Sequence, residues 1–169
     1  MVKARILVVE DELTIAKDIR NQLKRIGYDV IDDVIRSGEN AISKVEETLP
    51  TIVLIDIKLQ GKIDGIEAAE QIRNRFKIPG IYLTAYSDEN TLRRAKTTEP
   101  FGYLLKPFTP KQLQAIIEMA IYKSQMEHQL REREEALRVS EEKYRTLFEL
   151  ASDVFLTVLP DGKIIDANI

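Results

Sequence analysis

The stretch Thr51-Ile52-Val53-Leu54-Ile55-Asp56 decides the fold that this sequence predicts. Its apolar residues are mostly β-branched and run without interruption, which is typical of a strand buried on both faces in the middle of a parallel sheet. The strand ends on a carboxylate. Because open α/β sheets bind ligands at the carboxyl ends of their strands, Asp56 lies where chemistry is expected. Taken alone, such an aspartate is more often a turn residue or a helix cap.

The composition sets limits on the class of protein. A chain of 169 residues can form one domain of ordinary size plus something smaller. Apolar content of 44% and charged content of 31% are typical of a soluble globular protein. The absence of cysteine excludes disulfides and thiolate chemistry, and a net charge of −3 gives no electrostatic case for nucleic acid. No segment has the pattern of a membrane span or a signal peptide, so we expect a cytoplasmic protein that makes no use of a membrane.

Strand and helix patterns alternate along residues 1–122. Strands are expected at residues 3–9, 28–34, 51–56, 81–84 and 101–105. Helices are expected to end at Gly27 and Pro50, to begin at Ser37, Asp64 and Pro110, and to cover residues 88–98. Their inward faces would be formed by Leu13, Ala16, Ile19, Leu23 and Ile26; by Ala41 or Ile42, Val45 and Leu49; and by Ile66, Ala69, Ile72 and Phe76. This alternation predicts an α/β domain, with a doubly wound five-stranded parallel sheet and helices on both faces.

Polar residues stand at the carboxyl ends of four of the five expected strands, either as the last strand residue or directly after it. They are Glu10 and Asp11 after the first strand, Asp56 on the third, Thr84 on the fourth and Lys106 after the fifth. A parallel sheet brings all of them to one edge. Neighbouring carboxylates repel each other unless a cation lies among them. Mg²⁺ prefers one or two carboxylates plus waters and phosphate oxygens, so we expect Asp11 and Asp56 as direct ligands and Glu10 as a ligand through water.

Such a site suits phosphoryl transfer. With the metal bound, Asp56 can act as a nucleophile and form an acyl phosphate. Lys106 would neutralise the phosphoryl oxygens and Thr84 would donate its hydroxyl to one of them. The structural alternative is that Asp11 and Glu12 only cap the first helix and that Lys106 is an ordinary surface lysine.

The motifs together closely resemble the receiver domain of two-component response regulators. They are Val8-Val9-Glu10-Asp11-Glu12, Leu54-Ile55-Asp56, Gly61 with Asp64-Gly65, Leu83-Thr84-Ala85 and Tyr103-Leu104-Leu105-Lys106-Pro107. The resemblance covers residues 1–122 and implies a flavodoxin-like fold. It also implies that Asp56 accepts a phosphoryl group from a phosphohistidine of a sensor histidine kinase or phosphotransfer protein. Such a domain is not an enzyme with a separate substrate, because it catalyses only its own phosphorylation and dephosphorylation.

The resemblance assigns further roles residue by residue. Mg²⁺ would be held by Glu10, Asp11, Asp56 and the backbone carbonyl of Lys58. Thr84 and Lys106 would contact the phosphoryl group, and Tyr103 matches the switch aromatic of the family. Two positions depart from the family pattern, because Glu10 is longer than the usual aspartate and Lys58 adds a cation beside the acidic residues. We expect these two departures to alter the lifetime of the phosphate.

A long helix is expected to follow the receiver-like part. Residues 123–146 are rich in Glu, Arg, Lys and Gln without Gly or Pro, so the helix from Pro110 should reach about Leu150, a length of roughly 60 Å. The heptad a-seats are Ile116, Lys123, Leu130, Leu137 and Tyr144, and the d-seats are Met119, Met126, Arg133, Ser140 and Leu147. Seven of these ten are apolar, which favours a parallel homodimeric coiled coil with residues 123–148 as a helical linker. The alternative is a solvated single helix carrying i,i+4 ion pairs.

The tail changes character again after Ser140. Residues 141–153, a strand at 154–159, a Pro160-Asp161-Gly162 turn and a strand at 163–168 resemble the opening of a PAS sensor domain. A PAS domain needs about a hundred residues, so residues 149–169 would be its truncated start, and the output would contain a PAS domain. His128, the single histidine, weakly resembles the phosphoacceptor box of histidine kinases, but the following acid and later proline are missing, so we expect a surface residue.

Two other functions remain open from the sequence. A phosphohydrolase of the haloacid-dehalogenase type also uses an aspartyl nucleophile with Mg²⁺, a threonine and a lysine. Its nucleophile normally ends the first strand and has a second Asp two residues later, where this chain has Lys58. The other alternative is a dimerising scaffold whose receiver has lost its activity.

Overall fold

The computed structural model describes residues 4–85, 93, 94, 100–149, 156–161 and 163–167. It divides into two compact units, Met1–Gln125 and Met126–Ile169. The helix expected at residues 88–98 lies outside the described residues except for Arg93 and Arg94, which are helical.

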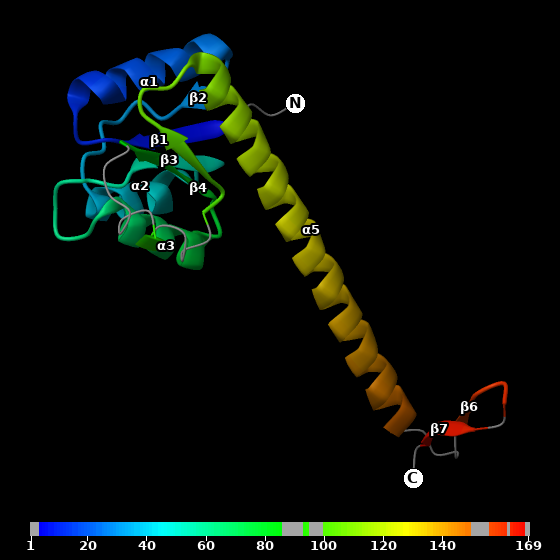
Figure 1. The fold of residues 1–169 in the computed structure, drawn as a ribbon. Helices are drawn as coiled ribbons and strands as arrows, with labels where there is room; N and C mark the ends of the chain where they lie inside the picture. Colours follow the sequence, from blue (N-terminus) through cyan, green and yellow to red (C-terminus); the bar gives the residue numbers. More distant parts are fainter. Residues whose placement is uncertain (1–3, 86–92, 95–99, 150–155, 162, 168–169) are drawn as a thin grey trace. The chain divides into compact units, whose positions relative to one another are not determined.

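The first unit is built on a parallel sheet of five strands. These are β1 (Arg5–Val9), β2 (Asp29–Val30), β3 (Ile52–Asp56), β4 (Gly80–Thr84) and β5 (Gly102–Leu105). Their order is β2-β1-β3-β4-β5 (Figure 1), which confirms the predicted sheet. β3 lies in the middle, and its residues from Ile52 to Ile55 are buried, as the uninterrupted apolar stretch predicted. The chain winds one way from β1 to β2 and the other way from β3 onward, so a crevice is expected between the ends of β1 and β3.

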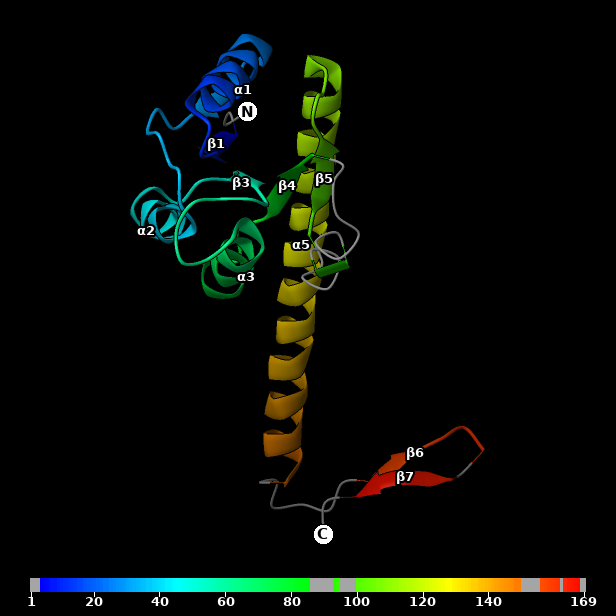
Figure 2. The same cartoon turned by 60° about the vertical axis from the view of Figure 1, so that its left-hand side comes forward.

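Helices cover both faces of this sheet. They are α1 (Leu13–Ile26), α2 (Gly38–Thr48), α3 (Gly65–Phe76) and the first turns of α5 (Pro110–Glu149). Figures 1 and 2 show α2 and α3 on one face and α1 on the other. The core is split in the same way. One cluster includes Val45 of α2 and Ile72 of α3, and the other includes Leu23 of α1 and Ile117 of α5.

The helix ends lie where the sequence signals placed them. α1 ends at Gly27, whose φ of 106° is in the left-handed region that glycine adopts without strain. The Ser37 side chain caps α2 by accepting a hydrogen bond from Asn40 N, and Asp64 caps α3 by accepting one from Glu67 N. These caps provide acceptors for backbone N–H groups that have no partner within the helix.

Two details of the expected elements are wrong. The second strand covers only Asp29–Val30 instead of residues 28–34, because the exposed residues 32–34 leave the ladder and the chain returns to β1 only in an isolated bridge between Ile35 and Val9. Leu49 was expected to face inward but is 65% exposed, because it ends α2 in a left-handed conformation with φ of 44°.

The expected inward face of α1 also needs correction. Leu13 is 54% exposed, so the buried face begins at Ala16 and continues through Ile19 and Leu23. In α3 the expected face is confirmed for Ile66, Ala69 and Ile72, while Phe76 is only partly buried. The apolar period therefore predicted the helix faces well in their middle turns and less well at their ends.

The second unit contains the rest of α5 and a hairpin. β6 (Leu156–Val158) pairs antiparallel with β7 (Ile164–Ala167). Leu159 N donates to Lys163 O at 2.8 Å, and Lys163 N donates to Asp161 Oδ1 at 3.0 Å. The predicted hairpin is therefore present at the expected turn. Residues 154, 155 and 168 of its predicted strands lie outside the described residues. Among the described residues, no helix is both long and apolar enough to cross a membrane.

Candidate phosphoacceptor site at the carboxyl edge of the sheet

The functional side chains predicted from the strand ends meet in one cavity. Its volume is about 270 Å³, and its lining includes Glu10, Asp11, Asp56, Lys58, Thr84 and Lys106. The parallel register explains this convergence. Val9 pairs with Ile55, Asp56 with Leu83, and Thr84 with Leu105, so the ends of these strands follow one another along one edge. The side chains of Glu10 and Lys106 meet there although 96 residues of sequence separate them.

Lys106 lies between two acidic residues of this cavity. Its Nζ donates to Glu10 Oε2 and to Asp56 Oδ2. The three side chains are 16%, 2% and 13% exposed respectively, so the interaction is largely shielded from water. The lysine is held in place from its backbone, because Lys106 N donates to Thr84 O at 2.8 Å. One ammonium therefore neutralises part of the charge of two carboxylates.

Burial and charge act in opposite directions on this trio. Burial raises the pKa of Glu10, the neighbouring Asp56 charge adds to the rise, and the hydrogen bond from Lys106 only partly offsets it. For Lys106, burial alone would lower the pKa, but the hydrogen bonds to Asp56 and Glu10 outweigh it and raise the pKa. The two shifts are consistent because two carboxylates share one cation. Lys106 stays charged, and Glu10 is a buried carboxyl that is more easily protonated than usual.

Backbone contacts fix the position of Asp56. Its Oδ1 accepts a hydrogen bond from Lys58 N at 2.8 Å, which closes a tight turn after the strand. The start of α3 approaches the same turn, since Gly65 N donates to Ile57 O at 3.0 Å. A Cβ on Gly65 would lie 1.8 Å from the backbone oxygen of Asp56. Only glycine allows this close approach.

The loop after Asp56 is held by a residue that sequence reasoning missed. Glu39, in the first turn of α2, accepts a hydrogen bond from Lys62 N through Oε1 at 2.7 Å. Its own backbone N–H and that of Lys62 lower the pKa of this carboxyl. Gly61 has φ of 121°, and a Cβ there would lie 2.6 Å from Glu39 Oε2. Gly61 signalled a turn in the sequence, but nothing local indicated its partner on α2.

Arg36 is a second residue that the sequence did not single out. Its Nε donates to the backbone oxygen of Asp11 at 3.0 Å. Glu12 occupies the N-cap position of α1, but its side chain makes no capping hydrogen bond. Glu12 N instead donates to Glu10 Oε1 at 3.4 Å. The alternative in which Glu12 caps the first helix through its side chain is therefore wrong.

Thr84 and Tyr103 complete the surroundings of the site. Thr84 Oγ1 donates to Ala85 O at 3.1 Å. The ring of Tyr103 is partly buried, with its centroid 5.7 Å from that of Tyr82. Its hydroxyl is buried without a hydrogen-bond partner among the described residues. Burial, followed by the influence of Tyr82, raises the pKa of Tyr103 to about 12.

The donor atoms of the cavity fit Mg²⁺ in their chemistry. Carboxylates of Glu10, Asp11 and Asp56 and the carbonyl of Lys58 are the hard oxygen ligands that this ion prefers. Within the described part of the chain, however, no three acidic, histidine or cysteine side chains are arranged to hold a metal by themselves. Lys106 is the resident cation between two of the carboxylates.

Comparison with known proteins identifies the family. The model of the response regulator receiver domain matches residues 6–118, and the chain belongs to this family. Its similarity to individual proteins is consistent with that membership. It is 33% identical over 120 residues to the transcriptional regulatory protein PdtaR of Mycobacterium tuberculosis, covering 71% of this chain and 58% of that protein. The chain thus spans little more than half the length of this curated relative.

Two solved structures share the receiver fold. The signal receiver domain of a modulated diguanylate cyclase from Desulfovibrio desulfuricans is 40% identical, with a TM-score of 0.71 over 74% of this chain and 98% of that one. The N-terminal domain of a response regulator/sensory box/GGDEF three-domain protein from Carboxydothermus hydrogenoformans is 32% identical, with a TM-score of 0.66 over 73% and 98%. Family membership favours the receiver over the phosphohydrolase alternative.

Proposed function

We propose that Asp56 is the phosphoacceptor of a two-component phosphorelay. The observation that carries this proposal is the contact of Lys106 with Asp56 in a cavity that Glu10, Asp11 and Thr84 also line. A carboxylate oxygen of Asp56 attacks the phosphorus of a phosphohistidine on a sensor kinase or phosphotransfer protein. The P–N bond breaks, a P–O bond forms, and the imidazole leaves as a neutral ring once it carries a proton.

The neighbouring residues have separate roles in this step. Glu10, Asp11, Asp56 and the Lys58 carbonyl would hold Mg²⁺, which neutralises phosphoryl charge. Lys106 contributes its ammonium to a phosphoryl oxygen, and Thr84 contributes its hydroxyl after giving up its bond to Ala85 O. Tyr103 acts as the switch aromatic. Its buried hydroxyl has no partner among the described residues, so a movement of the side chain that pairs or exposes this hydroxyl would be favourable, which supports the role. The chain catalyses only its own phosphorylation and dephosphorylation.

Mass spectrometry after incubation with Mg²⁺ and acetyl phosphate tests the proposal. We expect a mass gain of one phosphoryl group, and its loss in Asp56→Asn. Asp32→Asn is the matched control, because Asp32 is exposed and pairs with Lys24 away from the cavity. A gain that persists in Asp56→Asn, or no gain in the unmodified chain, contradicts the assignment.

We further propose that α5 mediates a parallel homodimer. The helix is continuous over 40 residues, and Leu130, Leu137 and Tyr144 are 58%, 61% and 56% exposed. These residues recur every seven positions, so in a helix they form one exposed apolar stripe. A second copy can cover this stripe.

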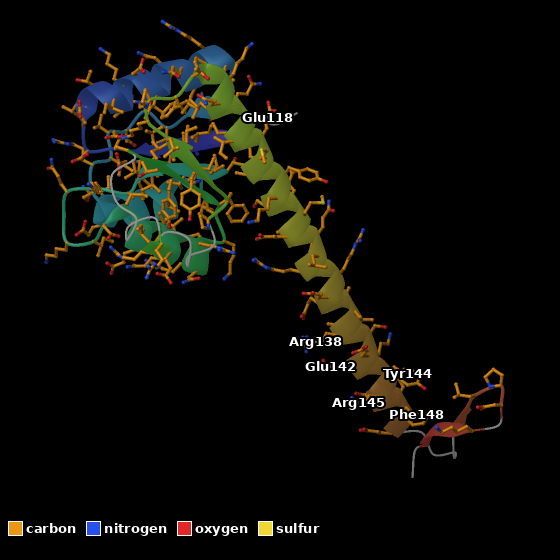
Figure 3. The ribbon with its side chains drawn as sticks, in the orientation of Figure 1. Glu118, Arg138, Glu142, Tyr144, Arg145 and Phe148 are labelled. Carbon is orange, nitrogen blue, oxygen red and sulfur yellow. The ribbon has the colours of Figure 1, made fainter. Side chains whose placement is uncertain are left out.

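Intrahelical ion pairs are also present, as the single-helix alternative requires. Arg138 contacts Glu135 at 2.7 Å and Glu142 at 2.5 Å, and Figure 3 shows Arg138 and Glu142 on the same part of α5. His128 is an exposed residue of this helix with Glu132 at 3.5 Å, as expected for a surface histidine. Exposed pairs of this kind contribute only about 0.3–0.5 kcal/mol each. They are compatible with either state and do not cover the apolar stripe.

Sedimentation equilibrium separates the two states. We expect a monomer–dimer equilibrium that Leu137→Asp weakens. Val139→Asp is the control, because Val139 has a similar exposure of 51% but lies off the a- and d-seats. A monomer at all concentrations, or equal effects of the two variants, contradicts the homodimer.

We propose that the signal passes from the receiver (residues 1–122) through the helical linker (123–148) to a PAS-containing output in the cytoplasm. Residues 149–169 would form the start of the PAS domain. The antiparallel hairpin of β6 and β7 supports this reading, as does the similarity to the N-terminal domain of a protein that combines a response regulator with a sensory box. A reporter kinase or cyclase fused in place of that output should become active only when Asp56 is phosphorylated. Reporter activity that is unchanged in Asp56→Asn would contradict the relay.

A further inference from the structure

The receiver engages two of the five a-seats of α5. Ile116, the first a-seat, packs on Gly102, where a Cβ would lie 2.6 Å from Ile116 Cδ1. Lys123, the second, places its Nζ 5.1 Å from the ring centroid of Phe101. Lys123 is itself exposed, as are the a-seats from Leu130 onward. The contacts of Ile116 and Lys123 thus place the first two a-seats against the receiver.

The geometry of a straight helix distinguishes these two a-seats. Heptad positions drift by about 20° per heptad around a straight α-helix. Within the first unit, Lys123 therefore lies further than Ile116 from the receiver-packed side of α5. Its side chain reaches the receiver through a long flexible stem.

Phe101 is placed to hold that lysine. It immediately precedes β5, its N–H donates to Gly80 O at 3.1 Å, and its ring packs against the core cluster that contains Leu113 and Ile117. The Arg73 guanidinium of α3 also lies over this ring, 5.5 Å from the centroid. Two cations from different helices thus converge on one aromatic ring, whose negative faces attract both.

We propose that the contact between Phe101 and Lys123 is a clasp that ends the receiver's hold on the a-seats of α5, so that the a-seats of the seam between two copies of the chain begin at Leu130. A lysine at an a-seat destabilises a coiled coil. The clasp removes this penalty by directing Lys123 onto the receiver. The proposal rests on the homodimer proposed above and specifies where its interface starts.

A double-mutant cycle on the full chain tests the clasp. Phe101→Leu keeps an apolar side chain but removes the ring, and Lys123→Met removes the charge. We expect Phe101→Leu to raise the dimer dissociation constant about 2- to 5-fold when Lys123 is present, and to leave it unchanged in the Lys123→Met background. Phe76→Leu is the matched control, because Phe76 also has a cation, Arg75, 5.0 Å from its ring centroid but packs against the other core cluster, which contains Ile72.

A direct measurement distinguishes failure of the clasp from failure of the homodimer. After reductive ¹³C-methylation of the lysines, the Lys123 signal should show an upfield ring-current shift that Phe101→Leu abolishes and Phe76→Leu preserves. Absence of that shift overturns the clasp. If the upfield shift is present but Phe101→Leu changes the dimer dissociation constant equally in both Lys123 backgrounds, the role of the clasp in the seam is overturned. A chain that stays monomeric in every variant overturns the homodimer and the seam together.

Discussion

Lys106 Nζ donates to Asp56 Oδ2 across 50 residues of sequence, and it donates to Glu10 Oε2 as well. The ammonium thus occupies the position between two carboxylates where a cation is needed. The chain itself therefore offsets part of the acidic charge of this site. This arrangement makes the lysine important for stability as well as for the proposed phosphoryl transfer.

Lys106→Met should lower the free energy of unfolding by about 3 kcal/mol at neutral pH without metal, because it leaves two buried carboxylates unpaired. Added Mg²⁺ should restore part of this loss. Urea denaturation with and without Mg²⁺ measures both effects. Lys44→Met is the control, since Lys44 also bridges two carboxylates, Asp33 and Glu47, but these are 55% and 67% exposed. Its cost should stay below about 1 kcal/mol, and equal costs would contradict the role assigned to Lys106.

Glu10→Gln should change how stability depends on pH. The pKa of Glu10 is raised above its ordinary 4.5 by burial first and by the Asp56 charge, so the folded state binds the proton more tightly than the unfolded state. The stability from this group is fully present below pH 4.5 and is lost as pH rises through the raised value. The variant should therefore gain stability relative to the native chain between acidic and neutral pH. Metal-free unfolding curves of the variant and the native chain over this pH range measure the difference, and a variant that is less stable than the native chain at neutral pH would contradict the role of burial.

Tyr103→Phe should stabilise the unphosphorylated receiver or leave it unchanged. The buried hydroxyl of Tyr103 has no partner among the described residues, so removing it relieves a desolvation cost of about 1 kcal/mol. Tyr82→Phe provides the contrast, because the Tyr82 hydroxyl donates to Ile66 O at 3.4 Å in the core. That variant should lose about 1 kcal/mol. If Tyr103→Phe were the more destabilising of the two in chemical denaturation, its hydroxyl would have a partner in solution.

Gly65→Ala should displace the backbone at the end of β3, where Asp56 lies. The added Cβ would lie 1.8 Å from Asp56 O, a distance that forces the backbone to move. We expect a loss of several kcal/mol in stability, as for other strongly overpacked positions, together with slower phosphorylation by acetyl phosphate. Gly80→Ala is a suitable control, since its Cβ would lie 3.6 Å from the nearest atom. Normal phosphorylation of Gly65→Ala would show that this backbone tolerates the shift.

Much of the fold followed from local patterns. The apolar run of β3, the caps at Gly27 and Asp64 and the 3.6-residue period of α1 and α3 predicted the elements because each depends on residues close in sequence. The convergence of Asp56, Thr84 and Lys106 also followed, since a parallel sheet places successive strand ends at one edge. The short β2 did not, because residues 32–34 leave the sheet and are exposed, which their alternating pattern did not signal.

By itself, the sequence determined which elements form, their order, and the edge of the sheet at which the functional groups gather. Only the tertiary structure decided that Lys106 lies between Glu10 and Asp56, that Glu39 holds the loop at Lys62, and that Phe101 contacts Lys123. The physical reason is the range of the interactions. Periods and caps depend on neighbours within a turn or two, whereas these contacts join segments that become adjacent only when the sheet and its helices pack.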